Sequence, residues 1–197
     1  MSLEKLLENV DIVAVTGQSE AVITGIASKH RAVKEGYAWI CYKGVHVDGH
    51  QFINRAIEKG ARVIIGDQPP PQDLPPNLTY VQTSNGRIAL SHIAANWFLQ
   101  PAKQLRLIGI TGTNGKTSTA YFTESIFKAA GIKTALLGTI DYHFGKFILP
   151  AKTTTPDQIR LHNLFVRIAD AKIKHVIMEG GGVVVSRGKN GHISEEN

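Results

Sequence analysis

The chain has 197 residues, 43% of them hydrophobic and 19% charged, with a net charge of +6. This composition excludes a disordered chain, and the absence of any apolar run of about 18 residues argues against a membrane-spanning protein. The Lys and Arg residues are scattered rather than gathered in a stripe, which argues against nucleic-acid binding, and the single cysteine, Cys41, is typical of a cytoplasmic protein without disulfides.

The first hundred residues predict a small α/β domain. Runs rich in Val and Ile predict strands within residues 10–17, 21–28, 37–44, 61–67 and 78–83. Apolar residues at helical spacing predict helices over residues 2–8, 49–61 and 85–100. Five prolines within residues 67–77 predict a stiff surface loop, and Pro101 stops the last helix. We therefore predict an N-terminal domain over residues 1–100, with a boundary at about 100–104.

A second α/β domain is predicted over residues 105–197. Strands are expected at residues 106–111, 132–139 and 174–179, helices at 116–131 and 157–170, and a turn-rich stretch after residue 139. Alternating strands and helices favour a parallel, doubly wound sheet. Residues 180–197, which begin with three glycines and three valines, form an atypical tail that does not resemble the continuation of a core.

The stretch "LIGITGTNGKTSTAYF" joins an apolar strand to a helix through a glycine-rich loop. Gly112 and Gly115 let the backbone approach a phosphate closely, and the free N–H groups of the helix start bind its oxygens. Lys116 supplies a positive charge for the phosphates, and Thr117 supplies a hydroxyl for Mg²⁺. The strict phosphate-loop pattern requires glycine at position 110, which is Ile110 here, so an ordinary glycine-rich turn is the alternative.

A phosphate loop also needs an acidic side chain that holds the metal from a neighbouring strand. Glu179 ends the apolar strand "HVIME", and the carboxyl ends of parallel strands are where α/β sheets bind ligands. Glu179 is therefore the second predicted metal ligand beside Thr117. Without the phosphate loop, a solvated acid at a strand end would be the simpler interpretation.

The loop "GITGTNGKTS" resembles the nucleotide loop of the Mur ligase family, ATP-dependent enzymes that add amino acids to UDP-muramoyl peptides in peptidoglycan precursor synthesis. By itself the loop also fits folylpolyglutamate synthetases. The block "RAVKEGYAWICYKGVHVDGHQFINRAIEKGA" and the motif "TTTPD" resemble the third ligases of the series, the UDP-N-acetylmuramoyl-dipeptide:amino-acid ligases. "ALLGT" and "HVIME" follow at similar distances, and the resemblance covers about residues 24–179.

The resemblance implies roles for individual residues. ATP would be held by Gly112, Thr113, Asn114, Gly115, Lys116, Thr117 and Ser118, with Lys116 at the transferred phosphate and Mg²⁺ held by Thr117 and Glu179. The UDP-MurNAc-dipeptide would contact Arg31, Val45, His46, Thr154 and Thr155. The complete enzyme would add diaminopimelate or lysine to UDP-MurNAc-L-Ala-D-Glu through an acyl phosphate. For His46, an exposed loop histidine without a ligand is the alternative.

The sequence departs from the family at two places. Lys29 and His30 replace an Asp-Ser pair before Arg31, and residues 180–183 read Gly-Gly-Gly-Val where the family has Val-Ser-Ser-His. We therefore expect a substrate domain followed by a partial ATP-binding domain, inactive in ligation by itself and monomeric. The alternatives are a folate- or cyanophycin-type amide ligase and a non-catalytic nucleotide-binding protein.

Overall fold

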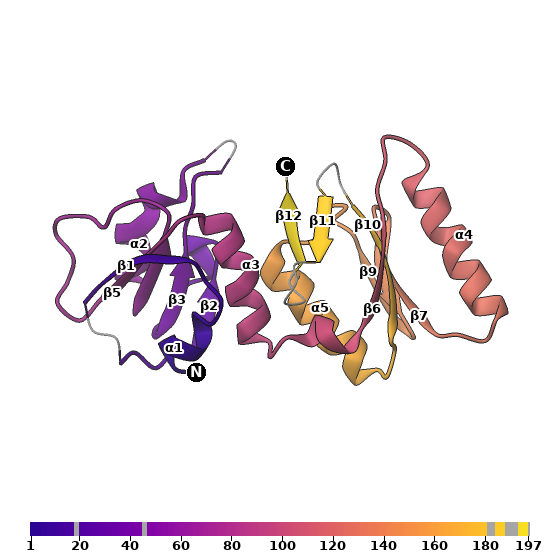
Figure 1. The fold of residues 1–197 in the computed structure, drawn as a ribbon, viewed down its shortest axis with the longest axis horizontal. Helices are drawn as coiled ribbons and strands as arrows, with labels where there is room; N and C mark the ends of the chain where they lie inside the picture. Colours follow the sequence, from indigo (N-terminus) through magenta and orange to yellow (C-terminus); the bar gives the residue numbers. More distant parts are fainter. Residues whose placement is uncertain (18–19, 45–46, 181–183, 188–192, 197) are drawn as a thin grey trace. The chain divides into compact units, whose positions relative to one another are not determined.

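The structure, a computed structural model, describes residues 1–17, 20–44, 47–180, 184–187 and 193–196. The chain divides into two compact units, Met1–Trp97 and Phe98–Asn197 (Figure 1). Each unit has its own five-stranded sheet with helices packed on it, which confirms the predicted α/β class. The roles expected for the two domains, substrate binding and ATP binding, stay predictions at this point.

The sheet of the first unit has the strand order β1-β5-β4-β3-β2. Only β1 runs antiparallel to its neighbour, while the other four strands are parallel. The predicted strands are all present, with the bounds β1 Ile12–Thr16, β2 Gly25–Ala27, β3 Tyr37–Ile40, β4 Val63–Gly66 and β5 Thr79–Thr83. The middle strands are buried on both faces, which matches their continuous apolar sequence.

Helices cover both faces of this sheet. The unit contains α1 Leu3–Leu6, α2 Ile53–Glu58 and α3 Gly86–Trp97, and the segment before α2 is a 3-10 turn, Gly49–Phe52. Trp39, Ile64 and Tyr80 come from three adjacent strands and pack with the apolar residues of α2. Figure 1 shows α3 on the opposite side of the strands from α2. The helix that the sequence predicted over residues 49–61 is therefore shorter and starts with a tighter turn.

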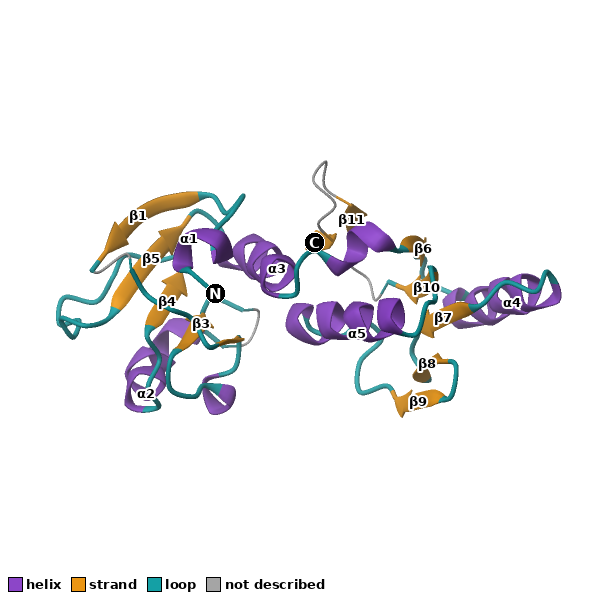
Figure 2. Ribbon diagram, turned by 90° about the horizontal axis from the view of Figure 1, so that it is seen from below, coloured by secondary structure: helices purple, strands orange, loops and turns teal. Residues whose placement is uncertain are grey.

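The second sheet has the strand order β6-β10-β7-β8-β9, which can be followed from top to bottom in Figure 2. Three strands, β6, β10 and β7, are parallel, whereas β8 and β9 are antiparallel. The sheet is therefore mixed rather than parallel throughout. The bounds of its strands are β6 Arg106–Ile110, β7 Thr134–Leu137, β8 Asp141–Phe144, β9 Phe147–Pro150 and β10 His175–Glu179.

The hairpin β8–β9 corrects the sequence prediction, which placed a turn-rich stretch after residue 139. Tyr142 and Phe144 are buried and alternate with the half-buried Asp141 and His143, so β8 has the period of two that a half-buried strand requires. Gly145 closes the hairpin with a positive φ of 56°. Strand β8 is short and contains polar residues, so its sequence does not indicate a strand. Its pairing with β7 stabilises it.

Two helices flank the second sheet on opposite faces (Figure 1). Helix α5, Gln158–Asp170, buries Leu161, Leu164, Phe165 and Ile168 against one face. Helix α4, Lys116–Ala129, buries only Ala120, which contacts Leu136 and Ile177 on the other face. Within the described residues, β6 is an edge strand that pairs with β10 alone. The atypical tail contains a separate antiparallel pair, β11 Val184–Arg187 and β12 Ile193–Glu196.

His143 joins α4 to the antiparallel part of the sheet. Its Nδ1 lies 2.6 Å from the Asp141 carboxylate and its Nε2 lies 2.8 Å from the Glu124 carboxylate. Burial lowers the pKa of His143, but the hydrogen bonds and negative charges of Asp141 and Glu124 outweigh it, and the pKa is raised above 6.5. The protonated ring is therefore the form that holds β8 and α4 together.

This arrangement predicts a loss of stability at alkaline pH. A group whose pKa is raised by folding contributes fully below its unfolded pKa, here 6.5, and the contribution is lost as the pH rises through the folded pKa. We expect His143→Gln to lower the melting temperature at about pH 6 and to have a smaller effect at about pH 9. Equal melting-temperature differences at both pH values would contradict this role, and the comparison with wild type cancels the titration of other histidines.

Candidate active site

The loop between β6 and α4, residues 111–115, has the backbone that close approach to a ligand requires. Gly112 and Gly115 have positive φ values of 146° and 75°, which other residues adopt only with strain. A Cβ at Gly115 would meet no atom within 4 Å. Conformation, and not lack of space inside the protein, is therefore the reason for glycine, and the surface above the loop is open.

The loop presents hydrogen-bond donors at the start of a 14-residue helix. In the part of the chain that the structure describes, the backbone N–H groups of residues 112–118 donate to no protein acceptor. The Lys116 ammonium folds back over the loop and donates to the Gly112 carbonyl at 2.7 Å. Free N–H groups, the positive helix end and one ammonium together favour a phosphate at this place.

Glu179 lies beside the loop because β10 is the direct neighbour of β6. The two strands are parallel, and Glu179 is paired in register with Ile110, the last residue of β6. The Thr117 hydroxyl donates to Glu179 Oε2 at 2.8 Å, although the two residues are 62 positions apart. Glu179 is only 1% exposed. The sheet topology thus places the carboxylate at the first turn of α4, where the sequence predicted it.

The donors at this place fit Mg²⁺. A Mg²⁺ ion takes oxygen ligands at about 2.1 Å in an octahedron, so that neighbouring ligand oxygens lie roughly 2.9 Å apart. The distance of 2.8 Å between Thr117 Oγ1 and Glu179 Oε2 agrees with two such neighbours. No cluster of three His, Cys, Asp or Glu residues suited to a metal occurs among the described residues. A Mg²⁺ ion with one carboxylate and one hydroxyl would complete its shell with water and phosphate oxygens.

Thr154 and Thr155 contact Thr139 and the backbone of Glu179, respectively. The Thr155 hydroxyl donates to the Glu179 carbonyl at 3.3 Å, and the hydroxyls of Thr154 and Thr139 are 3.2 Å apart. The Tyr142 hydroxyl, on a fully buried ring, donates to the Thr153 carbonyl and fixes the same segment. The structure therefore brings together the predicted phosphate loop, the predicted metal ligands and two of the predicted substrate residues.

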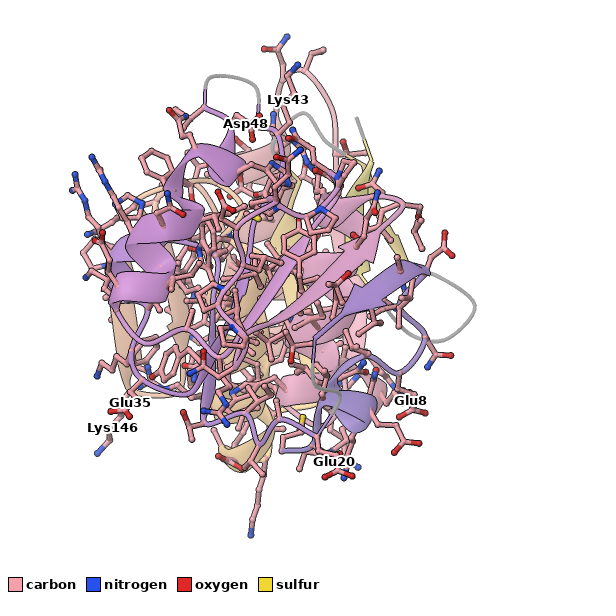
Figure 3. All side chains as sticks on the ribbon, turned by 90° about the vertical axis from the view of Figure 1, so that its left-hand side faces the viewer. Glu8, Glu20, Glu35, Lys43, Asp48 and Lys146 are labelled. Atoms are coloured by element: carbon pink, nitrogen blue, oxygen red, sulfur yellow. The ribbon has the colours of Figure 1, made fainter. Side chains whose placement is uncertain are left out.

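The first unit has a separate pocket of about 400 Å³ that includes Arg31. Lys29, Trp39 and Tyr42 also line it, so the pocket combines cationic and aromatic side chains. Val45 and His46 lie outside the described residues, although the flanking Gly44 and Val47 line the same pocket. Figure 3 shows Lys43 and Asp48, whose backbones form an isolated antiparallel bridge on either side of residues 44–47. A base and a phosphate could be held here by stacking and by charge.

Two protein-family models match the chain. The model described as "Mur ligase family, catalytic domain" matches residues 7–98, and "Mur ligase middle domain" matches residues 110–189. The chain belongs to the Mur ligase family. The second match begins at the end of β6. It includes the loop of residues 111–115, the segment of residues 153–155 and Glu179, which lie together in the structure.

Curated relatives of this Mur ligase chain are named UDP-N-acetylmuramoyl-L-alanyl-D-glutamate--2,6-diaminopimelate ligase. The protein from Clostridium perfringens is 37% identical over 179 residues, which are 91% of this chain and 37% of the relative. The protein from Geobacter sulfurreducens is 39% identical over 180 residues, 91% of this chain and 35% of the relative. The chain therefore spans a little over a third of the length of these relatives.

Solved Mur ligase structures share the fold. A structure of a UDP-N-acetylmuramoyl-L-alanyl-D-glutamate--2,6-diaminopimelate ligase superposes with a TM-score of 0.71 at 18% identity, covering 92% of this chain and 36% of the other. A structure of UDP-N-acetylmuramoylalanyl-D-glutamyl-2,6-diaminopimelate--D-alanyl-D-alanyl ligase from Acinetobacter baumannii gives a TM-score of 0.56 at 22% identity, covering 95% of this chain and 37% of the other. At these identities, the likeness supports the Mur ligase fold and nothing finer.

Sequence reasoning missed two residues that contact Glu179 in this candidate site. Gly138 packs directly on Glu179, since a Cβ there would lie 2.3 Å from Glu179 Oε1. Thr139 donates its N–H to Glu179 Oε1 at 3.2 Å and its hydroxyl to Oε2 at 2.9 Å. The motif "ALLGT" contains both residues, but their role becomes visible only when β7 is placed beside β10.

A second missed group lies in the first unit, around His50. Its ring Nδ1 lies 2.7 Å from the Asp48 carboxylate, and Nε2 lies 3.3 Å from the Asp67 carboxylate. Gln68 donates to the other oxygen of Asp48 at 3.1 Å. The "DGH" spacing in the sequence was the available signal. These contacts fix the start of the 3-10 turn Gly49–Phe52, which borders the Arg31 pocket.

None of the helices within the described residues has both the length and the apolar character that crossing a bilayer requires.

Proposed function

We propose that this chain binds ATP with Mg²⁺ at the phosphate loop and UDP-MurNAc-L-Ala-D-Glu through Arg31, Val45, His46, Thr154 and Thr155. The activity to which it contributes is the ligation of an amino acid, diaminopimelate or lysine, to the dipeptide. The names of the relatives support diaminopimelate as the amino acid that is added. The observation that carries the proposal is the Thr117–Glu179 contact of 2.8 Å beside a loop whose N–H groups face no protein acceptor.

Each residue has a chemical task in this proposal. The N–H groups of residues 112–118 and the Lys116 ammonium bind the ATP phosphates and stabilise the negative charge as the γ-phosphoryl group moves to a substrate carboxylate. ADP leaves, and the amino group of the incoming amino acid then displaces phosphate from the acyl phosphate. Thr117 and Glu179 would hold Mg²⁺, which neutralises charge on the phosphates when it is bound.

The partners and the cellular location belong to the same proposal. We place the chain in the cytoplasm as a monomer that binds neither membrane nor nucleic acid. The Cys41 thiol is buried and free, and burial together with the negative charges of Asp67 and Asp48 raises its pKa and leaves it unreactive. We also expect no ligation by the 197 residues alone, because the relatives are more than twice as long.

Calorimetric titration and thermal unfolding of the 197-residue chain together test the proposal. We expect binding of ATP in the presence of Mg²⁺, and a rise in melting temperature with UDP-MurNAc-dipeptide but not with folate. Stabilisation by folate would favour a folate-type ligase, and nucleotide binding without any effect of the UDP-sugar dipeptide would favour a non-catalytic nucleotide-binding protein. Absence of nucleotide binding would overturn the proposal.

A further inference from the structure

Thr139 contacts both Glu179, a proposed metal ligand, and Thr154, a proposed substrate-binding residue. It follows β7 directly, at the carboxyl end of a strand that neighbours β10. Its N–H and its hydroxyl donate to the two different oxygens of the Glu179 carboxylate, at 3.2 Å and 2.9 Å. Its hydroxyl oxygen is also 3.2 Å from the hydroxyl oxygen of Thr154. No other described residue hydrogen-bonds both oxygens of this carboxylate.

The Thr139 hydroxyl links the Glu179 carboxylate to the Thr154 hydroxyl. An ionised carboxylate only accepts, and a hydroxyl has one hydrogen to donate. The Thr139 hydroxyl therefore has two acceptors for its one hydrogen, Glu179 Oε2 at 2.9 Å and Thr154 Oγ1 at 3.2 Å. A continuous polar chain runs from Thr154 through Thr139 to Glu179, and Glu179 also accepts from Thr117 in the first turn of α4.

Glu179 needs this support because it is almost fully buried. Its residue is 1% exposed, and a buried carboxylate keeps one orientation only when its oxygens are hydrogen-bonded. Thr139 as a whole residue is exposed and is not part of the hydrophobic core, although its hydroxyl bonds to the Glu179 carboxylate. An exposed residue that fixes a buried carboxylate is better explained by ligand positioning than by packing.

We propose that Thr139 is a positioning residue that orients the Glu179 carboxylate toward the metal of the bound nucleotide and couples it to Thr154. This inference rests on the proposed function, because it assumes that Glu179 and Thr117 hold Mg²⁺. Residues that orient a metal ligand through hydrogen bonds affect metal affinity typically by about ten- to a hundredfold. Thr139 therefore governs the part of nucleotide affinity that depends on Mg²⁺.

Thr139→Val tests the role, because valine keeps the shape of threonine and removes the hydroxyl. We expect ADP to bind the variant about tenfold more weakly than wild type in the presence of Mg²⁺ and equally well in the presence of EDTA. Thr139→Ser restores the hydroxyl and is expected to restore the Mg²⁺-dependent affinity. Thr123→Val is the matched control, since among the described residues the Thr123 hydroxyl bonds only to the Thr119 carbonyl of its own helix, at 2.8 Å.

The link to Thr154 is tested by a double-mutant cycle on the same affinity. We expect Thr139→Val and Thr154→Val to be non-additive, because both interrupt one polar chain. Additive effects would overturn the coupling, and equal losses with and without Mg²⁺, or an unchanged Thr139→Val, would overturn the positioning role. A wild-type chain that binds no nucleotide would instead overturn the proposed function, and this inference would fall with it.

Discussion

Lys116→Ala is expected to weaken ATP binding by roughly ten- to a hundredfold, because each hydrogen bond to a charged group contributes about 1.5–3 kcal/mol. The ammonium now donates to the Gly112 carbonyl at the edge of the loop, 2.7 Å away. A phosphate oxygen offers a charged acceptor at the same place, so the side chain moves only a short way to bind it. Titration calorimetry with ATP and Mg²⁺ measures the effect directly.

The control for this variant is Lys128→Ala on the same helix. Lys128 is exposed and lies three turns from the loop, in the last turn of α4. It removes the same charge from the protein, so a comparable loss of affinity in both variants would show that net charge, and not the phosphate loop, attracts the nucleotide. The melting temperature of both variants should stay close to that of wild type.

Gly138→Ala is expected to disrupt the site from the side opposite to the loop. The added Cβ would lie 2.3 Å from Glu179 Oε1 and 3.0 Å from Leu136 Cδ2, so the carboxylate must move. Its hydrogen bonds from Thr139 and Thr117 are then lost or distorted, at a cost of about 1–3 kcal/mol for an unsatisfied buried group. We expect a lower free energy of unfolding and a loss of the Mg²⁺ dependence of ATP binding.

Gly109→Ala is the matched control for Gly138→Ala. Gly109 lies in β6, two residues before the loop, and a Cβ there would meet no atom within 4 Å. Denaturant unfolding and titration calorimetry should therefore give values near wild type for Gly109→Ala. If Gly138→Ala also bound ATP and Mg²⁺ as wild type does, Glu179 would not be the metal ligand that we propose.

The sequence was sufficient to predict the part of the site that depends on local chain order. A strand, two glycines, a lysine, a threonine and a helix follow one another in "LIGITGTNGKTSTAYF", and the structure has β6, the loop and α4 at these residues. Glu179 was predicted from a more general property, because parallel strands of one sheet end at the same edge. The contact with Thr117 agrees with that reasoning, while the binding roles stay predictions.

Other parts depend on tertiary contacts that no local pattern reveals. Strand β8 is only four residues long, and its two buried aromatic residues, Tyr142 and Phe144, are separated by a histidine that is held between two carboxylates. The importance of Gly138 and Thr139 follows from the pairing of β7 with β10, and the sequence does not state which strands are neighbours. Strand order was thus the information that sequence reasoning lacked.

The position of β10 between β6 and β7 has a consequence for the time course of synthesis. β6 and β7 leave the ribosome first, yet they have no hydrogen bonds to each other and must wait for a strand that begins only at His175. Native pairing of β6 therefore requires a connection across the intervening helices and hairpin, which slows folding relative to local contacts. A nascent chain that stops before His175 would expose two unmatched strand edges to chaperones or to other nascent chains.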